Sequence, residues 1–313
     1  MKNKRFRQLF RRRLDAHKGD FGHILIVAGS LRYSGAGVLA SAAALRCGAG
    51  LVTLGMPKSL CPAIIKIKPK EVMLLPLPQT ADIALAASAY RKIKESAEAV
   101  EVLALGPGLS QNKSAQKLAR ALVSGINKPM VIDADGLNAL VGNLNLLREP
   151  KTESFDFRLG LGTERSRSAA NRKPRILTPH PGEMARLLGT SVKSVQAKRK
   201  EVAKKFAQDH KVTLVLKGHW TVVASPEGRI YINKTGNPGM ASAGSGDVLA
   251  GMIAAFLGQG LRPFDAARHA VYIHGLAGDL AAKEKTQVGM IASDIVEKIP
   301  EALKKVVSRK KKD

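Results

Sequence analysis

Cysteine and aromatic residues are scarce in this chain. Of its 313 residues only two are cysteines, Cys47 and Cys61, and 4% are aromatic. Two cysteines cannot form the disulfide framework of a small secreted domain, and their spacing is not that of a metal site. We therefore expect both to be core residues of a protein in a reducing compartment, the cytoplasm.

Long apolar runs are missing as well. No stretch of about eighteen uncharged apolar residues occurs, and no apolar segment follows the basic N-terminus, so neither a spanning helix nor a signal peptide is predicted. Phe6, Leu9, Phe10 and Leu14 lie at helical spacing among arginines. Such a segment either lies on a membrane surface or docks on its own protein, and docking is the commoner outcome. We expect no membrane association.

Acidic residues are few compared with basic ones. The chain has 51 Lys+Arg and 25 Asp+Glu, a formal net charge of +26, which attracts polyanions at long range. The excess is concentrated in residues 2–13, 158–175 and 309–312. None of these segments carries a recognisable nucleic-acid recognition signature, so they predict nonspecific nucleic-acid contact or simple solvation.

The remaining composition is that of a globular protein. Hydrophobic residues make up 45% of the chain, enough for a full core. Short apolar runs alternate with amphipathic or Ala-rich stretches, a pattern that predicts an α/β fold with a mainly parallel sheet flanked by helices. Strands are expected at residues 23–28, 51–54, 100–105, 130–133 and 175–178, and a short antiparallel region in the last third at 212–217, 221–224 and 229–232. Helices are expected at residues 38–47, 248–257, 266–282 and 294–307.

A single domain over residues 19–300 accounts for this pattern. Residues 1–18 form a basic N-terminal extension, and residues 301–313 are the end of the last helix and a basic tail. Residues 151–173 are charged and show no periodicity, so we expect a basic insertion or exposed loop there.

Polar and glycine-rich segments follow several of the predicted strands. They are Gly29-Ser30, Gly106-Pro107-Gly108, Asp133-Ala134-Asp135-Gly136 and the segment from Thr178 to Glu183. Open α/β sheets bind ligands at the carboxyl ends of their strands, where such loops converge. We expect the functional site at this rim.

The most informative segment runs from Asn233 to Gly251, from the end of a strand into an apolar helix. The amides of Gly244, Ser245 and Gly246 precede or begin that helix, where unpaired N–H groups and the helix dipole favour an anion. Asp247 beside such a site could take a proton from a hydroxyl that attacks phosphorus. Its alternative role is to cap the helix.

Competing motifs are weaker. Residues 35–40 match G-x-G-x-x-A, but the loop before them is long for a dinucleotide-binding turn, and the strand at residues 51–54 is not followed by the acid that would hold a ribose. No phosphate-binding G-x-x-x-x-G-K-[S/T] loop occurs. His269 and His274 do not share a helix face and suit core or surface positions, so zinc chemistry has no support.

Six ordered segments resemble the ADP/ATP-dependent NAD(P)H-hydrate dehydratases of the ribokinase-like superfamily. The segments are residues 29–37, 106–109, 133–135, 178–183, 217–221 and 237–251, and the agreement extends from about Gly19 to Val296. The resemblance implies a repair lyase that removes water from the 6-hydroxy form of NADH or NADPH. The 6-hydroxyl would be phosphorylated by ADP and eliminated as phosphate, leaving AMP.

The resemblance also implies which residues act. Asp247 would be the acid/base, with Gly244, Ser245 and Gly246 as an anion hole. The hydrated dinucleotide would contact Ala36, Gly108, His180 and Asp247, and the nucleotide would contact Lys217, Gly218, His219, Trp220, Thr221 and Gly246. His180 and Lys217 could equally have structural roles, the one in a rigid loop and the other at a strand end.

Magnesium and partners follow from the same resemblance. Asp133 and Asp135 could hold Mg²⁺ through water, or cap a helix at Leu137. ADP, rather than ATP, is expected as phosphate donor because standalone members of the family are mostly bacterial and use it. A homotetramer is expected by analogy. The match begins near Gly19, which leaves no space for the epimerase domain often fused to such enzymes, so we expect action on the S epimer and reliance on a separate epimerase.

Two alternative functions remain open. The first keeps the fold and is a kinase of a small hydroxylated metabolite such as a vitamin precursor, which would leave a stable phosphorylated product. The second is a nucleic-acid-associated protein that uses its basic arms and would bind RNA with steep salt dependence.

Overall fold

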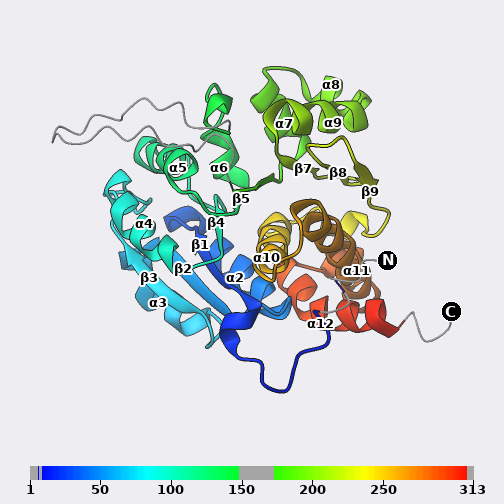
Figure 1. Ribbon diagram of the computed structural model, residues 1–313, viewed down its shortest axis with the longest axis horizontal. Helices are drawn as coiled ribbons and strands as arrows, with labels where there is room; N and C mark the ends of the chain where they lie inside the picture. Colours follow the sequence, from blue (N-terminus) through cyan, green and yellow to red (C-terminus); the bar gives the residue numbers. More distant parts are fainter. Residues whose placement is uncertain (1–5, 7–8, 148–172, 309–313) are drawn as a thin grey trace.

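The computed structural model describes residue 6 and residues 9–147 and 173–308. Nine strands in this part of the chain form one sheet, in the order β3-β2-β1-β4-β5-β6-β7-β8-β9 (Figure 1). The strands are β1 His23–Val27, β2 Leu51–Pro57, β3 Met73–Leu77, β4 Val102–Leu105, β5 Met130–Ile132, β6 Arg175–Leu177, β7 Thr213–Leu216, β8 Val222–Ala224 and β9 Ile230–Ile232. Neighbours from β3 to β7 are parallel, and β7, β8 and β9 are antiparallel. The predicted mainly parallel sheet with an antiparallel region in the last third is confirmed.

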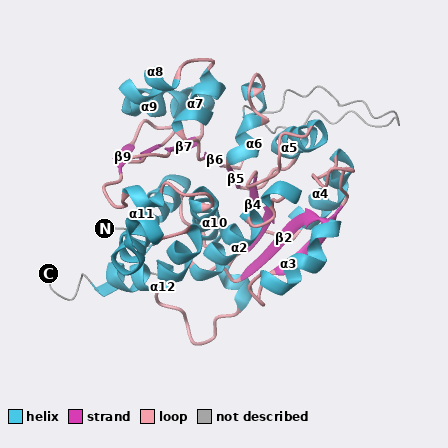
Figure 2. Cartoon of the chain, turned by 180° about the vertical axis from the view of Figure 1, so that it is seen from behind, coloured by secondary structure: helices cyan, strands magenta, loops and turns pink. Residues whose placement is uncertain are grey.

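Helices cover both faces of this sheet (Figures 1 and 2). On one face pack α2 Ala36–Arg46, α3 Cys61–Ile67, α10 Ser245–Gly258, α11 Pro263–Gly289 and α12 Ala292–Ser308. On the other pack α4 Tyr90–Glu98, α5 Lys113–Gly125, α6 Ala134–Asn138, α7 Pro181–Leu188, α8 Val192–Ala197 and α9 Arg199–His210. Short 3₁₀ turns lie at Lys18–Phe21, Leu31–Tyr33, Lys58–Leu60, Ala87–Ala89, Leu144–Leu147 and Pro238–Met240. The molecule is therefore a three-layer α/β/α structure.

Alternation of side chains along the central strands builds two cores. In β1, Ile24 and Ile26 belong to the cluster under α2 and α10, whereas Leu25 and Val27 belong to the cluster under α4 and α5. All four are fully buried. Parallel strands covered on both faces read as continuous apolar runs, and this is why the sequence reveals them.

One strand escapes sequence reasoning. β3 lies at the sheet edge, beside β2 alone. It contains Pro76, which is tolerated in an edge strand because one side makes no ladder, and Met73 is 41% exposed. A short, half-exposed edge strand with a proline lacks the apolar run by which the other strands were recognised.

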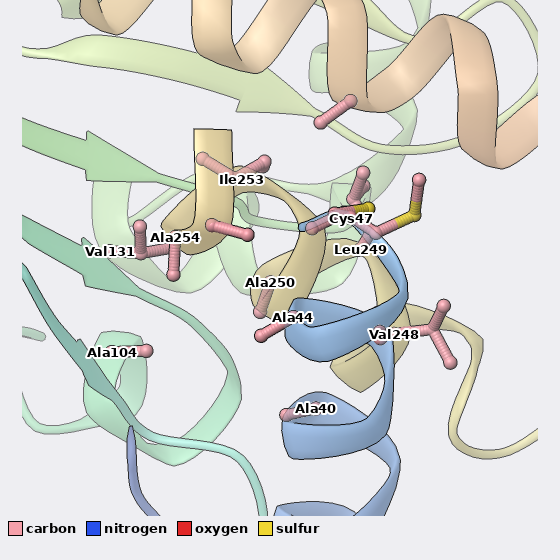
Figure 3. Packing of buried hydrophobic residues seen from close by; sticks show 14 of the residues in the cluster. Ala40, Ala44, Cys47, Ala104, Val131, Val248, Leu249, Ala250, Ile253 and Ala254 are labelled. Atoms are coloured by element: carbon pink, nitrogen blue, oxygen red, sulfur yellow. The ribbon is translucent and has the colours of Figure 1, made fainter. Parts of the chain in front are cut away.

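Two helices of the first face, α2 and α10, pack unusually closely, and small residues make this possible. Figure 3 shows Ala44 of α2 next to Ala250 of α10, with Ala40 one turn away on α2. A Cβ built on Gly251 would lie 2.0 Å from the carbonyl oxygen of Ala40. The glycine thus allows the backbones to touch, and this contact sets where α10 begins at the rim.

We expect Gly251→Ala to destabilise the fold. In an open helix this change would gain about 1 kcal/mol, but here the added methyl meets backbone, so we expect a net loss of more than about 2 kcal/mol in the free energy of unfolding. Urea denaturation measures it. Gly35→Ala is the control, because nothing lies within 4 Å of a Cβ there, and an equal loss in both variants would refute the close-packing explanation.

The N-terminal segment docks on the protein itself where it is described. Phe6 is 2% exposed and its ring stacks on that of His269, with centroids 3.7 Å apart. Arg12 lies over the ring of Phe21 and donates to the carbonyl of Gly48. Leu14, by contrast, is fully exposed, so the four apolar positions do not form one common face.

Other expectations are tested in part. Both cysteines are buried and free, as predicted. Among the described residues, none of the helices is both long enough and apolar enough to cross a bilayer. The predicted insertion at residues 151–173 lies, except for Lys173, outside the described residues.

Candidate active site at the carboxyl rim of the sheet

The loops after β1 and β4–β7 meet at one rim of the sheet, as the sequence predicts. The amide of Gly29 donates to the carbonyl of Pro107 across this rim, at 2.9 Å. A Cβ on Gly106 would lie 1.8 Å from the carbonyl oxygen of Asp133. The glycines allow neighbouring loops of the rim to pack backbone against backbone.

The anion loop, residues 233–247, ends at the start of α10. Gly244 has φ +88° and occupies the N-cap position, and a Cβ there would lie 2.5 Å from Leu39, so only glycine fits. Ser245, Gly246 and Asp247 form the first turn, whose amides have no partner within the helix. The Ser245 amide donates to the Ser242 carbonyl at 3.4 Å, so the helix start presents the N–H groups of Gly246 and Asp247 and a partial positive charge to the rim.

Asp247 does not cap this helix. It is the third residue of α10, after the N-cap Gly244, for which no side-chain capping bond is made. Burial first, and then the charge of Asp133, raise the pKa of Asp247 to about 7 against the opposing charge of Lys217. A carboxyl group with this pKa can both accept and release a proton near neutral pH.

Lys217 lies at the centre of a buried charge cluster formed with Asp133 and Glu183. Its Nζ is 2.7 Å from Asp133 Oδ1 and 3.9 Å from Glu183 Oε2. Asp133 also accepts a hydrogen bond of 2.7 Å from the Thr178 hydroxyl. Both carboxyl side chains are less than 10% exposed and that of Lys217 is 18% exposed, so their charges interact through protein more than through water.

The cluster keeps the lysine charged. Burial lowers the pKa of Lys217, but the carboxylates of Asp133 and Glu183 outweigh burial and leave it raised. Burial raises the pKa of Glu183, and Lys217 opposes that shift. A Cβ built on Gly246 would lie 3.2 Å from the Lys217 ammonium. The fixed cation therefore stands directly beside the anion loop.

His180 is the N-cap of α7 and also faces the rim. Its Nδ1 accepts hydrogen bonds from the amides of Gly182 and Glu183, at 2.9 and 3.3 Å. In the neutral ring the proton is then on Nε2, which lies 3.5 Å from Glu183 Oε1. Burial, followed by the charge of Lys217, lowers the pKa of His180. The half-exposed ring of His180 thus caps α7 through Nδ1 and has Nε2 near the Glu183 carboxylate.

Ala36 and Gly108, the other positions expected at the hydrated dinucleotide, lie together. Gly108 has φ +62°, and a Cβ there would lie 2.6 Å from Tyr33 and 3.0 Å from Ala36. The Ser30 hydroxyl donates to the Gly108 carbonyl at 2.8 Å. The start of α2 and the loop after β4 therefore form one wall of the rim.

The segment from Lys217 to Thr221 turns sharply after β7. Gly218 has φ +132° and Trp220 has φ +55°, the latter an unusual backbone for a bulky residue. The rings of His219 and Trp220 are stacked with centroids 5.1 Å apart, and Trp220 is 55% exposed. The Thr221 hydroxyl donates to the Gly218 carbonyl at 3.0 Å. The segment thus divides into the buried Lys217 and an exposed aromatic pair.

The two aspartates proposed for magnesium differ in the groups that their carboxylates bind. Asp133 occupies the N-cap position of α6 without capping it, because its Oδ1 binds Lys217 and Thr178. Asp135 accepts from the Ser110 amide and the Asn138 amide group, one on each oxygen. In the described part of the chain no three His, Cys, Asp or Glu side chains form a metal-binding group.

Two residues of the site had no assigned role in the sequence prediction. Glu183 is 6% exposed and completes the charge cluster; a glutamate two residues after a helix-starting proline signals a capping box, and it makes that bond too, accepting from the His180 amide at 2.7 Å. His274 lies 3.4 Å from the Ser245 hydroxyl. No spacing rule signals His274.

A cavity of about 370 Å³ lies elsewhere, among α7, α8 and α9. Its lining combines the apolar Leu188, Val195, Val202 and Phe206 with six polar or charged residues. None of the predicted site residues contributes to it, so it is separate from the rim.

This chain is similar to known proteins over most of its length. The family model described as NAD(P)H-hydrate dehydratase matches residues 24–155 and 158–301. An ADP-dependent (S)-NAD(P)H-hydrate dehydratase from Neisseria meningitidis is 39% identical over 295 residues, which cover 93% of this chain and 88% of that protein. A bifunctional NAD(P)H-hydrate repair enzyme from Moorella thermoacetica is 43% identical over 95% of this chain, which spans only 52% of that longer protein.

A solved structure supports the same assignment. The ADP/ATP-dependent NAD(P)H-hydrate dehydratase from Bacillus subtilis, co-crystallised with ATP/Mg²⁺, superposes with a TM-score of 0.74 at 31% identity, and the match covers 94% of this chain and 93% of that one. The ribokinase-like fold expected from the sequence is thereby confirmed. On the family model and these relatives together, the chain belongs to the NAD(P)H-hydrate dehydratase family.

Proposed function

We propose that this chain catalyses the ADP-dependent dehydration of the S epimer of NAD(P)H hydrate to NAD(P)H. The observation that carries the proposal is the placement of Asp247, with a pKa of about 7, in the glycine-rich first turn of α10 beside the buried ammonium of Lys217. This arrangement combines a proton acceptor, amide donors and a fixed cation. Phosphoryl transfer to a hydroxyl requires these three.

The chemistry follows in two steps. Asp247 takes the proton of the 6-hydroxyl, whose oxygen attacks the terminal phosphorus of ADP, and AMP leaves. The carbon–oxygen bond of the new phosphate ester then breaks, phosphate leaves with the bonding electrons, and a proton is lost from the neighbouring ring carbon to form the double bond of NAD(P)H. The amides of Gly244, Ser245 and Gly246 would hold the negative charge that develops on phosphate oxygens.

The two walls of the rim suggest where each substrate lies. We assign the hydrated dinucleotide to Ala36, Gly108 and His180, with its hydroxyl at Asp247. We assign the nucleotide to residues 217–221 and Gly246, because the Lys217 ammonium stands 3.2 Å from the Cβ position of Gly246 and the exposed rings of His219 and Trp220 follow it.

Magnesium fits this site only if it arrives with the nucleotide. Mg²⁺ keeps several waters and takes one or two carboxylates along with substrate phosphates. Of the two aspartates proposed, Asp135 has both oxygens occupied. Asp133 binds Lys217 and Thr178 through Oδ1, and its Oδ2 lies 3.7 Å from the Cβ position of Gly246. We therefore keep Asp133, through water, as the candidate. A bound ion would neutralise phosphate charge.

The raised pKa of Asp247 predicts a pH profile. The base must be deprotonated, and its pKa is about 7, so kcat/KM should rise with pH through about 7 and fall about tenfold per pH unit below it. Initial rates between pH 5.5 and 8.5, with circular dichroism at each pH to verify folding, measure this. A flat profile over that range would contradict the role of Asp247 as base.

A spectrophotometric assay tests the function. The protein is mixed with S-NADH hydrate, Mg²⁺ and either ADP or ATP, and the reduced nicotinamide absorbance is followed together with free phosphate. We expect both to appear with ADP. A phosphorylated product without free phosphate would favour a small-metabolite kinase, and no reaction with either nucleotide would reject the proposal.

Several properties of the whole protein are proposed on the same basis. The chain would rely on a separate epimerase, so pure R epimer should give no NADH until an epimerase is added. It would be a cytoplasmic homo-oligomer, a tetramer by analogy, which sedimentation can test. The basic segments would make at most nonspecific contact with nucleic acid, weakening steeply with salt.

A further inference from the structure

The anion loop is attached along its length to one helix, α11. Asn233 donates to the carbonyl of Val271 at 3.0 Å, and the Thr235 hydroxyl donates to the carbonyl of Tyr272 at 2.9 Å. A Cβ on Gly275 would lie 2.3 Å from the Thr235 hydroxyl. The loop therefore lies directly on the surface of α11.

One turn further along α11, Asp279 holds the next part of the loop. Its two oxygens accept from the Gly236 amide at 3.0 Å and from the Asn237 amide group at 3.2 Å. The first half of the loop is thus fixed by bonds to α11. The end of the loop, which carries the anion-binding amides, needs its own attachment.

His274 makes that attachment. It lies on α11 between the contacts at Tyr272 and Asp279, is 8% exposed, and its Nε2 is 3.4 Å from the Ser245 hydroxyl. Ser245 is the first residue of α10. One side chain of α11 therefore reaches the turn whose amides face the rim.

The imidazole is neutral in this position. Burial lowers the pKa of His274 to about 4, helped by the nearby charge of Lys217 and opposed by a hydrogen bond with the Ser245 backbone. A neutral ring has one donor and one acceptor nitrogen, so it adds no charge beneath the anion loop. The ring can therefore position Ser245 by hydrogen bonding without adding charge.

We propose that His274 is a positioning residue that fixes Ser245 and, through it, the first turn of α10 against the reacting phosphate. This inference rests on the proposed function for its kinetic readout. The amides of the first turn stabilise charge only if they are already aimed at it, and a misplacement of about 1 Å can cost about 100-fold in rate. His274 does not touch the substrate in this scheme.

Two substitutions at His274 distinguish the loss of its hydrogen-bonding nitrogens from a loss of side-chain volume. His274→Phe keeps the ring and removes both nitrogens, and we expect kcat to fall about 100-fold while the KM values for ADP and hydrate stay within about threefold. His274→Gln places an amide nitrogen near the Nε2 position and should recover most of that loss. A merely structural role would move both variants together and would appear as lost folded protein.

His269 offers a matched control. It lies on the same helix, is fully buried, and is also held neutral, but its ring stacks on Phe6, away from the rim. His269→Gln should reduce stability without changing kcat. An equal fall in kcat for His269→Gln and His274→Phe would overturn the proposal.

Ser245→Ala tests whether the two residues act through one contact. If they do, Ser245→Ala lowers kcat, and the double variant with His274→Phe is no slower than the slower single variant. Multiplicative losses in the double variant, or a His274→Phe enzyme within twofold of the parent kcat, would refute the inference.

An NMR measurement detects the contact between His274 and Ser245 without relying on enzyme activity. It therefore tests the contact separately from the proposed dehydratase function. In ¹⁵N NMR spectra, Ser245→Ala should shift the Nε2 signal of His274 and leave that of His269 unchanged. A shift in a protein without hydrate activity would reject the proposed function alone. An unchanged His274 signal would reject the contact, whatever the activity.

Discussion

Replacing Asp247 with asparagine should lower kcat by about 10³- to 10⁴-fold, at the upper end of what a positioned acid/base contributes. Asparagine has nearly the same shape but cannot take the hydroxyl proton. Because burial disfavours the charged form of Asp247, the substitution should leave stability unchanged or slightly higher. Steady-state rates with S-NADH hydrate and calorimetric titration with ADP measure the two sides of this prediction, and ADP affinity should stay within about threefold.

A second aspartate provides the control. Asp294 is the third residue of α12, as Asp247 is of α10, and its carboxylate accepts from the Ile291 amide at 2.7 Å. Asp294→Asn repeats the same chemical change at the same helical position away from the charge cluster, and kcat should be unaffected. If Asp247→Asn kept activity within about tenfold, roughly 1.4 kcal/mol of barrier, Asp247 would not be the base.

The central fold was predictable because burial on both faces leaves a strong signal in sequence. Strands such as β1 and β4 are continuous apolar runs, and every predicted strand is found within three residues at each end. β3 was missed because an edge strand is half exposed and carries Pro76, so neither a run nor an alternation marks it. Its position comes from pairing with β2, which is a long-range contact.

The residues of the site also differ in how well the sequence predicts their surroundings. The first turn of α10 was predictable because glycines followed by an apolar helix are a local pattern, and Asp247 was placed with it. The charge cluster was not, because Lys217 and Asp133 are 84 residues apart and each had an adequate local role, the one at a nucleotide and the other at a metal. Only the assembled sheet shows that the two residues form an ion pair.

His274 illustrates the limit of spacing arguments. Sequence spacing predicts that it does not share a helix face with His269, and both histidines lie in α11. What each histidine contacts depends on tertiary packing. The N-terminal segment brings Phe6 to His269, and the packing of α10 against α11 brings Ser245 to His274, 29 positions away. The two buried histidines then have opposite surroundings, the Phe6 ring for one and the anion loop for the other.

Replacing Lys217 with methionine should cost more stability than any other single change at the rim. The side chain keeps its approximate length, but Asp133, 1% exposed, and Glu183, 6% exposed, lose their counter-charge. Breaking a buried ion pair by removing one partner typically costs about 3–5 kcal/mol, and we expect a loss of that size in urea unfolding at pH 8. Nucleotide-dependent activity should also vanish, because the cation beside Gly246 is gone.

The pH dependence of that loss identifies its cause. Lys217 opposes the burial that raises the pKa of Glu183, so its removal raises that pKa further, and the folded variant then binds more protons than the unfolded chain. The stability of the Lys217→Met variant therefore falls as pH rises, and its deficit relative to the parent should be smaller at pH 5 than at pH 8.

Adding Asp133→Asn to this variant should restore part of the stability. As a control, Lys205→Met removes an exposed partner of Asp209 and should change the free energy of unfolding little. If the deficit of Lys217→Met were equal at both pH values, lost packing and not lost charge would be its cause.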